Sequence, residues 1–330
     1  MDETRLELLG QVAVWYYEDK LDQAEIASRV GKSRSMISKM LNEVRELGFV
    51  ETRVNYPLRR DAGLEEGLCA TFGLEQAWVL ARQRFDNTDD STLRLVGKLA
   101  AKCLQSRLFD GIRIGVSWGM AVEELVRAMP RIELREAEVV QIIGSISYGG
   151  SPSDGSELVR SLSGKLNANF RFLPAPLIVN SNTVAKSLFD QQTIRDTLNV
   201  ARQVDVAVVG IGTTHPSLST LFTSGYITEG DLEHLSARGA VGDVLSRSID
   251  RWGREIEGGF NERTIGLELA ALHSIPSVIG LAGHVLKADA VLAALRGGYI
   301  DTLVTDYRTA HEVLELHTSA GTLHEQERGA

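Results

Sequence analysis

From about residue 75 onward, short apolar runs rich in β-branched residues alternate with helical segments, and this alternation constrains the fold more than any other feature of the sequence. Each run ends in a Gly, Ser, Thr or Asp turn and usually leads into a helix, such as 120–129 or 286–295. The runs are 77–80, 112–116, 139–143, 204–211, 277–281 and 302–305. Apolar strands joined by helices are typical of a parallel sheet covered on both faces. The sequence therefore predicts an α/β fold with a parallel sheet in this region.

The first 56 residues instead predict three short helices. Apolar spacing indicates a first helix over 5–19, a second over 23–30 that Asp22 caps, and a third that Ser33 opens and Gly48 ends. The apolar positions expected to face the core are Leu6, Leu9, Val12, Ala13, Tyr16, Ile26, Val30, Met36, Ile37, Met40, Leu41, Val44 and Leu47. A short strand over 49–55 is predicted after them, in the position of a wing.

The second and third helices have helix-turn-helix spacing. Ala27 is small where the two helices cross, Gly31 supplies the turn, and Ile37 packs the third helix onto the second. In this motif the third helix lies in the major groove. The residues predicted to contact DNA are Lys32, Ser33, Arg34, Ser35, Ser38 and Lys39. A helical bundle with a solvated basic face is the alternative.

The distribution of charge favours DNA binding, although the whole chain has a net charge of -9. Residues 29–60 hold eight basic and three acidic side chains, whereas residues 61–330 hold 25 basic and 34 acidic ones. A local basic region can meet phosphates while the acidic remainder limits unspecific binding. One small domain reads few base pairs, so specific binding predicts a homo-oligomer, a dimer or tetramer, on paired half-sites of operator DNA.

The predicted domains are a DNA-binding domain over 1–56, a linker helix within 57–74 and an effector domain over 75–330. In the effector domain, several turns that follow strands are rich in glycine and hydroxyl residues. Such turns meet at the carboxyl edge of an open parallel sheet, where ligands bind. The turn 115–119 also opens a helix, whose free amides favour an oxyanion.

Two charged residues of this domain suit a sugar-like ligand. Asp243 can accept hydrogen bonds from hydroxyl groups, and Lys287 can neutralise a phosphate or another anionic substituent. The candidate effector-binding residues are Ser117, Trp118, Gly119, Gly144, Ser145, Gly212, Thr213, Asp243, His284 and Lys287. Ordinary strand-to-helix turns, a capping Asp, a structural His and a solvated Lys are the alternatives.

Other classes of protein are not indicated. Cys69 and Cys103 have neither disulfide-framework nor zinc-site spacing, and no cofactor or metal is predicted. The sequence contains no apolar run of roughly 18 residues that would predict a membrane span. The first ten residues mix charges into an apolar pattern, unlike a secretion signal, so a cytoplasmic location is expected.

A series of motifs extends from about residue 12 to residue 316. They are 14–17 with 21–27, 35–41, 114–119, 174–177, 208–212, 224–227, 239–243 and 303–306. With these motifs in this order, the whole chain resembles the SorC family of sugar-binding transcriptional regulators, also called the deoxyribonucleoside-regulator-like group.

The resemblance implies a winged or sigma-like helix-turn-helix followed by a domain similar to ribose-5-phosphate isomerase and glucosamine-6-phosphate deaminase. It also implies a tetramer and effectors that are usually phosphorylated sugars. By position, Ser117 to Gly119 with Thr213 would hold one end of the effector, and Asp243 with Lys287 the other. Many members have threonines after the Trp-Gly pair, where this chain has Met120 and Ala121. This departure leaves an unphosphorylated sugar or polyol open.

The predicted function is that of a transcriptional regulator, not an enzyme, whose affinity for operator DNA is modulated by a sugar, a polyol or a sugar phosphate. The alternative is a sugar-phosphate isomerase or deaminase with Asp243, Glu229 or His284 as general base. The sequence contains no compact acid–base pair that demands this. Imine formation by Lys287 would require a desolvated amine, which its place on an amphipathic helix does not predict.

Overall fold

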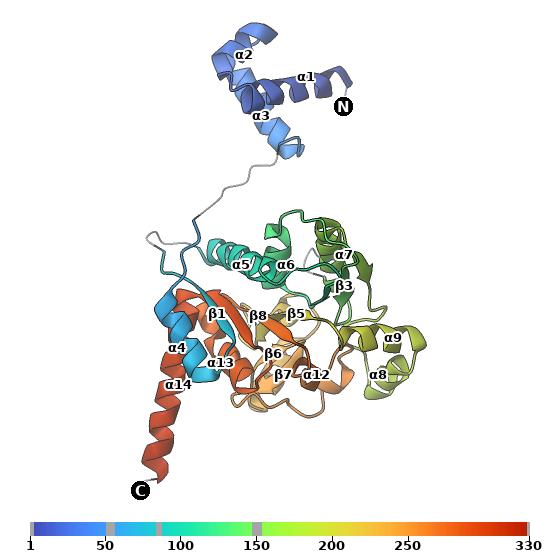
Figure 1. The fold of residues 1–330 in the computed structure, drawn as a ribbon, viewed down its shortest axis with the longest axis vertical. Coiled ribbons are helices and arrows are strands. Elements are labelled where there is room, and N and C mark those ends of the chain that lie inside the picture. The colour runs from blue at the N-terminus through green and yellow to red at the C-terminus, as the bar shows by residue number, and fades with distance from the viewer. Residues whose placement is uncertain (1–2, 51–56, 84–87, 147–153, 329–330) are drawn as a thin grey trace. The chain divides into compact units, whose positions relative to one another are not determined.

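The computed structural model describes residues 3–50, 57–83, 88–146 and 154–328 of the chain. The chain divides into two compact units, Met1–Pro57 and Leu58–Ala330. Figure 1 shows a small helical unit and a larger unit in which helices surround a sheet. Each unit has its own hydrophobic core.

The small unit contains the three predicted helices. Its elements are α1 (Glu3–Ala13), which continues into the π-helical turn η1 (Val14–Glu18), then α2 (Gln23–Val30) and α3 (Arg34–Glu46). The Asp22 carboxylate accepts hydrogen bonds from the backbone of Ala24 and Glu25, and the Glu25 carboxylate accepts one from Asp22 N–H. Gly31 ends α2 in the left-handed region at φ 66°, which only glycine adopts without strain. Ser33 caps α3 as predicted.

Packing of the small unit corrects three core predictions, those of Leu6, Met36 and Leu47, because Leu6 is half-buried and outside the core and the other two are exposed. The buried core holds Leu9, Val12, Ala13, Ile26, Ala27, Ile37, Met40, Leu41 and Val44. Met36 is 44% exposed and Leu47 38% exposed, because both lie at the edge of the apolar stripe of α3, beyond the arc that α1 and α2 cover. Phe49 and Val50 are in no strand, and the rest of the predicted wing lies outside the described residues.

The larger unit is built on the predicted parallel sheet. Seven strands pair in parallel in the order β1-β9-β8-β5-β2-β3-β4, and the antiparallel pair β6–β7 attaches to the end of β5. The strands are β1 (Gln76–Leu80), β2 (Arg113–Val116), β3 (Glu138–Gln141), β4 (Asn169–Arg171), β5 (Val206–Thr213), β6 (Ala240–Val244), β7 (Arg247–Asp250), β8 (Ser277–Leu281) and β9 (Thr302–Asp306). The six runs read from the sequence all became strands, whereas β4, β6 and β7 were not predicted.

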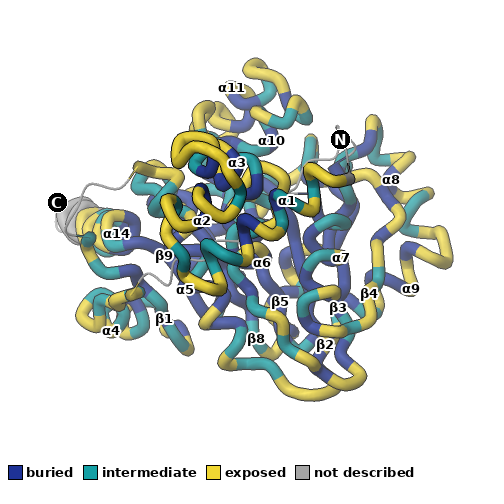
Figure 2. The backbone as a smooth tube through the Cα atoms, turned by 90° about the horizontal axis from the view of Figure 1, so that it is seen from above, coloured by how far each residue is buried: buried dark blue, intermediate teal, exposed yellow. Residues whose placement is uncertain are grey.

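Helices cover both faces of the sheet. They are α4 (Ala62–Phe72), α5 (Asp89–Gln105), α6 (Met120–Ala128), α7 (Gly155–Leu166), α8 (Asn182–Phe189), α9 (Gln192–Ala201), α10 (Thr220–Thr223), α11 (Glu229–Ala237), α12 (Leu269–Leu272), α13 (Ala288–Arg296) and α14 (Tyr307–Arg328), with short 3-10 turns η2 (Asn261–Arg263) and η3 (Val285–Lys287). Val206 and Val208 of β5 pack with α5, α6 and α7, whereas Ala207 and Val209 pack with α4, α9, α13 and α14. The strands other than the edge strand β4 are therefore buried along most of their length (Figure 2).

The predicted linker helix is part of the larger unit. Helix α4 packs against β1 and α14, and its Leu68 is fully buried in the core of that unit. The preceding segment is tied to the same sheet, because Asp61 N–H donates to the Val79 carbonyl and Ala81 N–H to that of Arg59. We therefore assign α4 to the larger unit, which begins at Leu58.

None of the described helices combines the length and the apolar composition that a bilayer-spanning segment needs. The described His, Cys, Asp and Glu side chains also form no cluster that could hold a metal ion.

Candidate functional site

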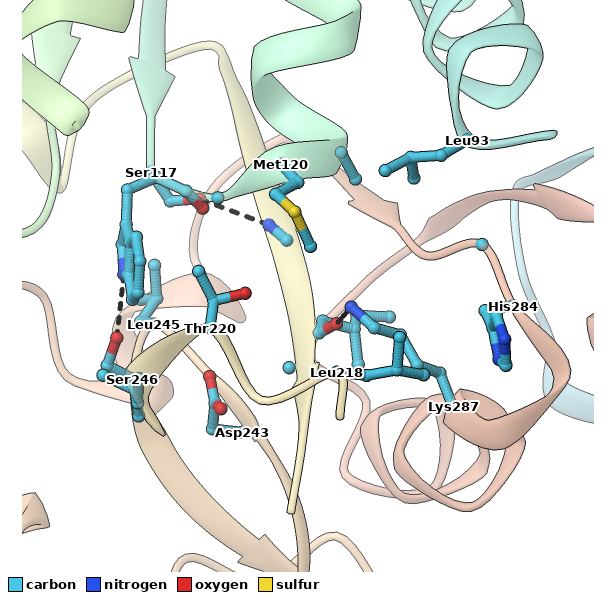
Figure 3. Close-up of a pocket in the computed structure, with 18 of the residues that line it drawn as sticks. Leu93, Ser117, Met120, Leu218, Thr220, Asp243, Leu245, Ser246, His284 and Lys287 are labelled. Atoms are coloured by element: carbon cyan, nitrogen blue, oxygen red, sulfur yellow. Dashed lines mark hydrogen bonds between the residues drawn. The ribbon is translucent and has the colours of Figure 1, made fainter. Parts of the chain in front are cut away.

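A cavity of about 110 Å³ lies at the carboxyl edge of the sheet, where β2, β5 and β8 end (Figure 3). The turn after β2, the end of β5, the turn after β8 and strand β6 all contribute to its walls. Seven of the ten candidate effector residues line it: Ser117, Trp118, Gly119, Gly212, Asp243, His284 and Lys287. Segments far apart in the chain meet here because parallel strands place all their carboxyl ends at one edge.

Three candidate residues do not line this cavity. The turn of Gly144 and Ser145 follows β3, and a Cβ atom at Gly144 would lie 2.4 Å from the Pro176 carbonyl oxygen. This glycine therefore serves close packing, and Ser145 N–H donates to the Ala175 carbonyl beside it. Thr213 is buried, and its hydroxyl accepts a hydrogen bond from His215 N–H at 3.2 Å. Residue type and position after a strand could not reveal these orientations.

Ser117 and Trp118 form the wall of the cavity through hydrogen bonds inside the protein. The Ser117 hydroxyl accepts a hydrogen bond from Gly210 N–H at 3.2 Å, which joins the ends of β2 and β5. The Trp118 indole N–H donates to the Ser246 hydroxyl at 2.9 Å, which joins the β2 turn to the β6–β7 turn. Both polar groups are thus already hydrogen-bonded within the protein, so these two residues contribute to ligand binding mainly through the shape of the wall.

Asp243 and Lys287 form a pair of opposite charges in the cavity. Asp243 lies on β6 opposite Gly212 of β5, and the Lys287 ammonium donates to the Ile211 carbonyl at 2.9 Å. Burial raises the pKa of the Asp243 carboxyl to about 6, although the Lys287 charge and a hydrogen bond from the Ser246 backbone act to lower it. Burial lowers the pKa of the Lys287 ammonium, and the Asp243 charge opposes this. Lys287 is therefore a desolvated lysine, which the sequence analysis did not predict.

The raised pKa of Asp243 predicts a pH-dependent stability. Between about pH 4 and pH 6 the unfolded chain has lost this proton and the folded chain keeps it, so the free energy of unfolding falls as pH rises. Asp243→Asn removes this contribution. We expect the variant to gain roughly 1–2 kcal/mol relative to the natural chain from about pH 4.5 to about pH 7. Urea unfolding at several pH values measures this, and a difference that does not change with pH would contradict it.

Gly212 provides the space that the Asp243 carboxylate occupies. A Cβ atom at position 212 would lie 2.1 Å from the Asp243 Oδ1 atom, well inside van der Waals contact. The Gly212→Ala substitution should therefore displace the carboxylate while the core stays intact. We expect roughly a tenfold loss of effector affinity, equivalent to about 1.4 kcal/mol. Calorimetric titration measures this loss, and Gly164→Ala, where the added methyl meets nothing within 4 Å, is the control.

His284 holds three elements together beside the cavity. Its backbone N–H donates to Asp306 at 2.9 Å, its Nδ1 accepts from Leu286 N–H at 3.1 Å, and its Nε2 lies 3.2 Å from the Asp89 carboxylate. Because Nδ1 accepts, the neutral ring carries its proton on Nε2, facing Asp89. The backbone of His284 adopts φ 103°, which is strained for a residue with a side chain. His284 thus orders the 3-10 turn that presents Lys287.

Sequence reasoning missed several residues of the cavity. Asp89 and Asp90 come from the first turn of α5, and Leu93, Met120 and Leu218 supply apolar walls. Asp89 and Asp90 follow the helix-capping Thr88, so their signal in the sequence is that of an ordinary acidic helix start. Only the folded chain brings this helix start to the carboxyl edge of β2 and β8.

The six residues predicted to contact DNA lie at the start of α3 and in the turn before it. All are exposed except Ser38, which is half-buried, and Ser33 caps the helix through its hydroxyl. Within the described part of the chain, Lys32, Arg34 and Lys39 make no ion pair, so their charges are available to phosphates. Asn42, which the sequence analysis omitted, is also exposed, one turn beyond Ser38 on the same face.

Other basic residues of the small unit are engaged within the protein. Arg5 pairs with Glu43 at 2.7 Å, Arg45 donates to the Tyr17 hydroxyl at 2.8 Å, and the guanidinium of Arg29 lies 5.7 Å from the ring centre of Trp15. These contacts hold α1, η1 and the helix-turn-helix together. The structure thus distinguishes the basic residues that stabilise the small unit from the exposed basic residues of α3.

The similarity to known proteins extends over both units of the chain. Residues 56–315 match the family model described as "Putative sugar-binding domain". The chain is 34% identical over 315 residues to the transcriptional regulator LsrR of Klebsiella pneumoniae subsp. pneumoniae, covering 94% of this chain and 93% of that protein. It is 28% identical over 316 residues to the deoxyribonucleoside regulator of Bacillus subtilis, with 95% and 99% covered.

Solved structures give the same result. The full-length sorbitol operon regulator SorC from Klebsiella pneumoniae superimposes with a TM-score of 0.70 at 30% identity, covering 94% of this chain and all of that one. A DeoR family transcriptional regulator from Listeria monocytogenes covers 76% of this chain with a TM-score of 0.71 at 30% identity. With its helix-turn-helix unit and its parallel-sheet unit both matched, the chain belongs to the SorC family of sugar-binding transcriptional regulators.

Proposed function

We propose that this chain binds operator DNA through α3 and its preceding turn, and that a small polyhydroxy effector in the cavity of the larger unit sets the affinity for DNA. The observation that carries the proposal is the cavity at the carboxyl edge, where Asp243 and Lys287 face a ligand-sized space. A sugar hydroxyl is both donor and acceptor, so it can donate to the Asp243 carboxylate and accept from the Lys287 ammonium.

The apolar walls support the same ligand class. Leu93, Met120 and Leu218 line the cavity together with Asp243 and Lys287. A sugar or polyol presents C–H groups as well as hydroxyls, so it suits a cavity with walls of both kinds. The names of two relatives, a sorbitol operon regulator and a deoxyribonucleoside regulator, agree with a polyol or sugar-related effector.

The mechanism is a difference in affinity. An effector that binds one conformation of the oligomer better than another shifts the population by that difference in free energy, and DNA affinity follows. Residues that contact the effector on β5, β6 and η3 belong to three separate elements, so binding changes how these elements are held together. The small unit reads DNA as part of a homo-oligomer on paired half-sites.

An imine-forming enzyme is the second candidate, because Lys287 is desolvated and its pKa is lowered. Its ammonium already donates to the Ile211 carbonyl, which favours a hydrogen-bonding role. Incubation with ribose 5-phosphate and borohydride distinguishes the two functions. An unmodified protein by mass spectrometry is expected, and a reduced adduct on Lys287 would favour the enzyme.

The test of the proposal combines DNA binding with effector binding. Fluorescence anisotropy on DNA from upstream of the gene should show specific binding, and one compound from a panel of pentoses, hexoses, polyols and their phosphates should change it. The same compound should raise the melting temperature, because it binds the folded state. A compound that stabilises the protein and leaves DNA affinity unchanged would contradict the coupling.

A further inference from the structure

We propose that the effector of this protein is an uncharged polyhydroxy compound, a sugar or polyol without a phosphate group, because three residues that line the cavity, Asp89, Asp90 and Asp243, carry carboxylates and one, Lys287, carries an ammonium. The inference rests on the proposed function and specifies its ligand. It departs from the phosphorylated effectors that the family resemblance implies.

The charges around the cavity are predominantly negative. Among the described residues that line it, three carry carboxylates and Lys287 alone carries an ammonium. His284, whose Nε2 lies 3.2 Å from the Asp89 carboxylate, does not change the sign, because the three carboxylates outnumber Lys287 and His284 together. A phosphate would bring up to two further negative charges into this field, whereas a neutral polyol brings none.

The turn after β2 also lacks the side chains that bind phosphate. Met120 and Ala121 follow Gly119 there, and the hydroxyl of Ser117 is engaged with Gly210 N–H. The first amides of α6 point to the cavity without a side-chain cap, but a helix start contributes only about half a positive charge. Asp89 and Asp90 line the same cavity and oppose this partial charge, although both residues are exposed and water screens their carboxylates. A hydroxyl oxygen can accept from these amides without that repulsion.

The neighbouring cavity offers no excess of positive charge either. It measures about 730 Å³ and shares Asp89 and His284 with the first, so a longer ligand could reach it. Arg82 and Arg308 line it, but Glu312, Asp306 and Asp89 line it as well. Arg308 also has an interaction partner within the protein. A phosphate that extended past His284 would therefore again meet more carboxylates than guanidinium groups.

The decisive experiment compares matched pairs of compounds by isothermal titration calorimetry on the full chain. The pairs are ribose and ribose 5-phosphate, fructose and fructose 6-phosphate, and sorbitol and sorbitol 6-phosphate. We expect the compound that binds to be a neutral member, at least tenfold tighter than its phosphate. A phosphate that binds tighter than its parent would overturn the inference and leave the proposed function standing. No binding by any compound, with no effect on DNA affinity, would overturn both.

A double variant tests the cause of the preference. Asp89→Asn with Asp90→Asn removes two negative charges and keeps side chains that can hydrogen-bond to His284. The preference for the neutral compound over its phosphate should then fall about tenfold, and less at high salt. Glu66→Gln with Glu233→Gln, at exposed positions of α4 and α11, removes the same charge elsewhere and should not change the ratio. An unchanged ratio in the Asp89 and Asp90 variant would overturn the electrostatic explanation.

Discussion

Replacing Asp243 by alanine is expected to abolish the effector response, with an affinity loss of at least about 100-fold. The variant removes the buried carboxylate that accepts hydrogen bonds from the ligand and leaves the Lys287 ammonium without its counter-charge. Hydrogen bonds to a charged, desolvated group are worth about 1.5–3 kcal/mol each, and two of them account for the loss. Calorimetric titration with the compound that binds the natural chain measures it.

DNA affinity of the Asp243→Ala protein should stay within about twofold of the natural chain, because α3 and its turn are in the other compact unit. Glu233→Ala, an exposed acid of α11, is the matched control and should respond normally. A normal response of the Asp243→Ala protein would show that the effector binds elsewhere. A loss of both activities, with a lowered melting temperature, would instead show a structural role for Asp243.

The double substitution Arg34→Ala with Lys39→Ala is expected to weaken operator binding by about 100-fold or more at physiological salt. Both cations are exposed on α3 and make no ion pair among the described residues, so they can each replace counterions on a phosphate or reach a guanine edge. If both contact phosphates, the slope of log affinity against log salt should fall by about 1.8. Fluorescence anisotropy over a series of salt concentrations measures both quantities.

The control for this experiment removes two positive charges from the larger unit. Lys186 lies on α8 and Arg195 on α9, and both residues are exposed. The double variant Lys186→Ala with Arg195→Ala should leave operator affinity close to normal. Effector affinity should be unchanged in both double variants. Equal weakening in the two variants would show that overall charge matters more than α3, and unchanged binding of the Arg34 and Lys39 variant would remove α3 from the DNA surface.

Much of the fold followed from local patterns. The second helix was predicted at its observed bounds because a capping acid precedes it and a left-handed glycine follows it. The six apolar runs became strands because both faces of a covered sheet need apolar side chains. The hairpin of β6 and β7 was missed because its alternating, partly polar residues read as a turn, and Asp243 was therefore not seen as a strand residue facing Gly212.

The sequence by itself determined the two units, the parallel sheet, the basic helix and seven of the residues that line the cavity, because helix caps, apolar periodicity and turn glycines act over a few neighbouring positions. The tertiary structure alone decided which turns share a cavity and how charged that cavity is. Gly144 packs against Pro176 while Gly212 makes room for Asp243, and Asp89 arrives from a helix that begins far from both in the chain. Desolvation and the field of neighbouring charges depend on the distances between such segments, and those distances exist only once the sheet has formed.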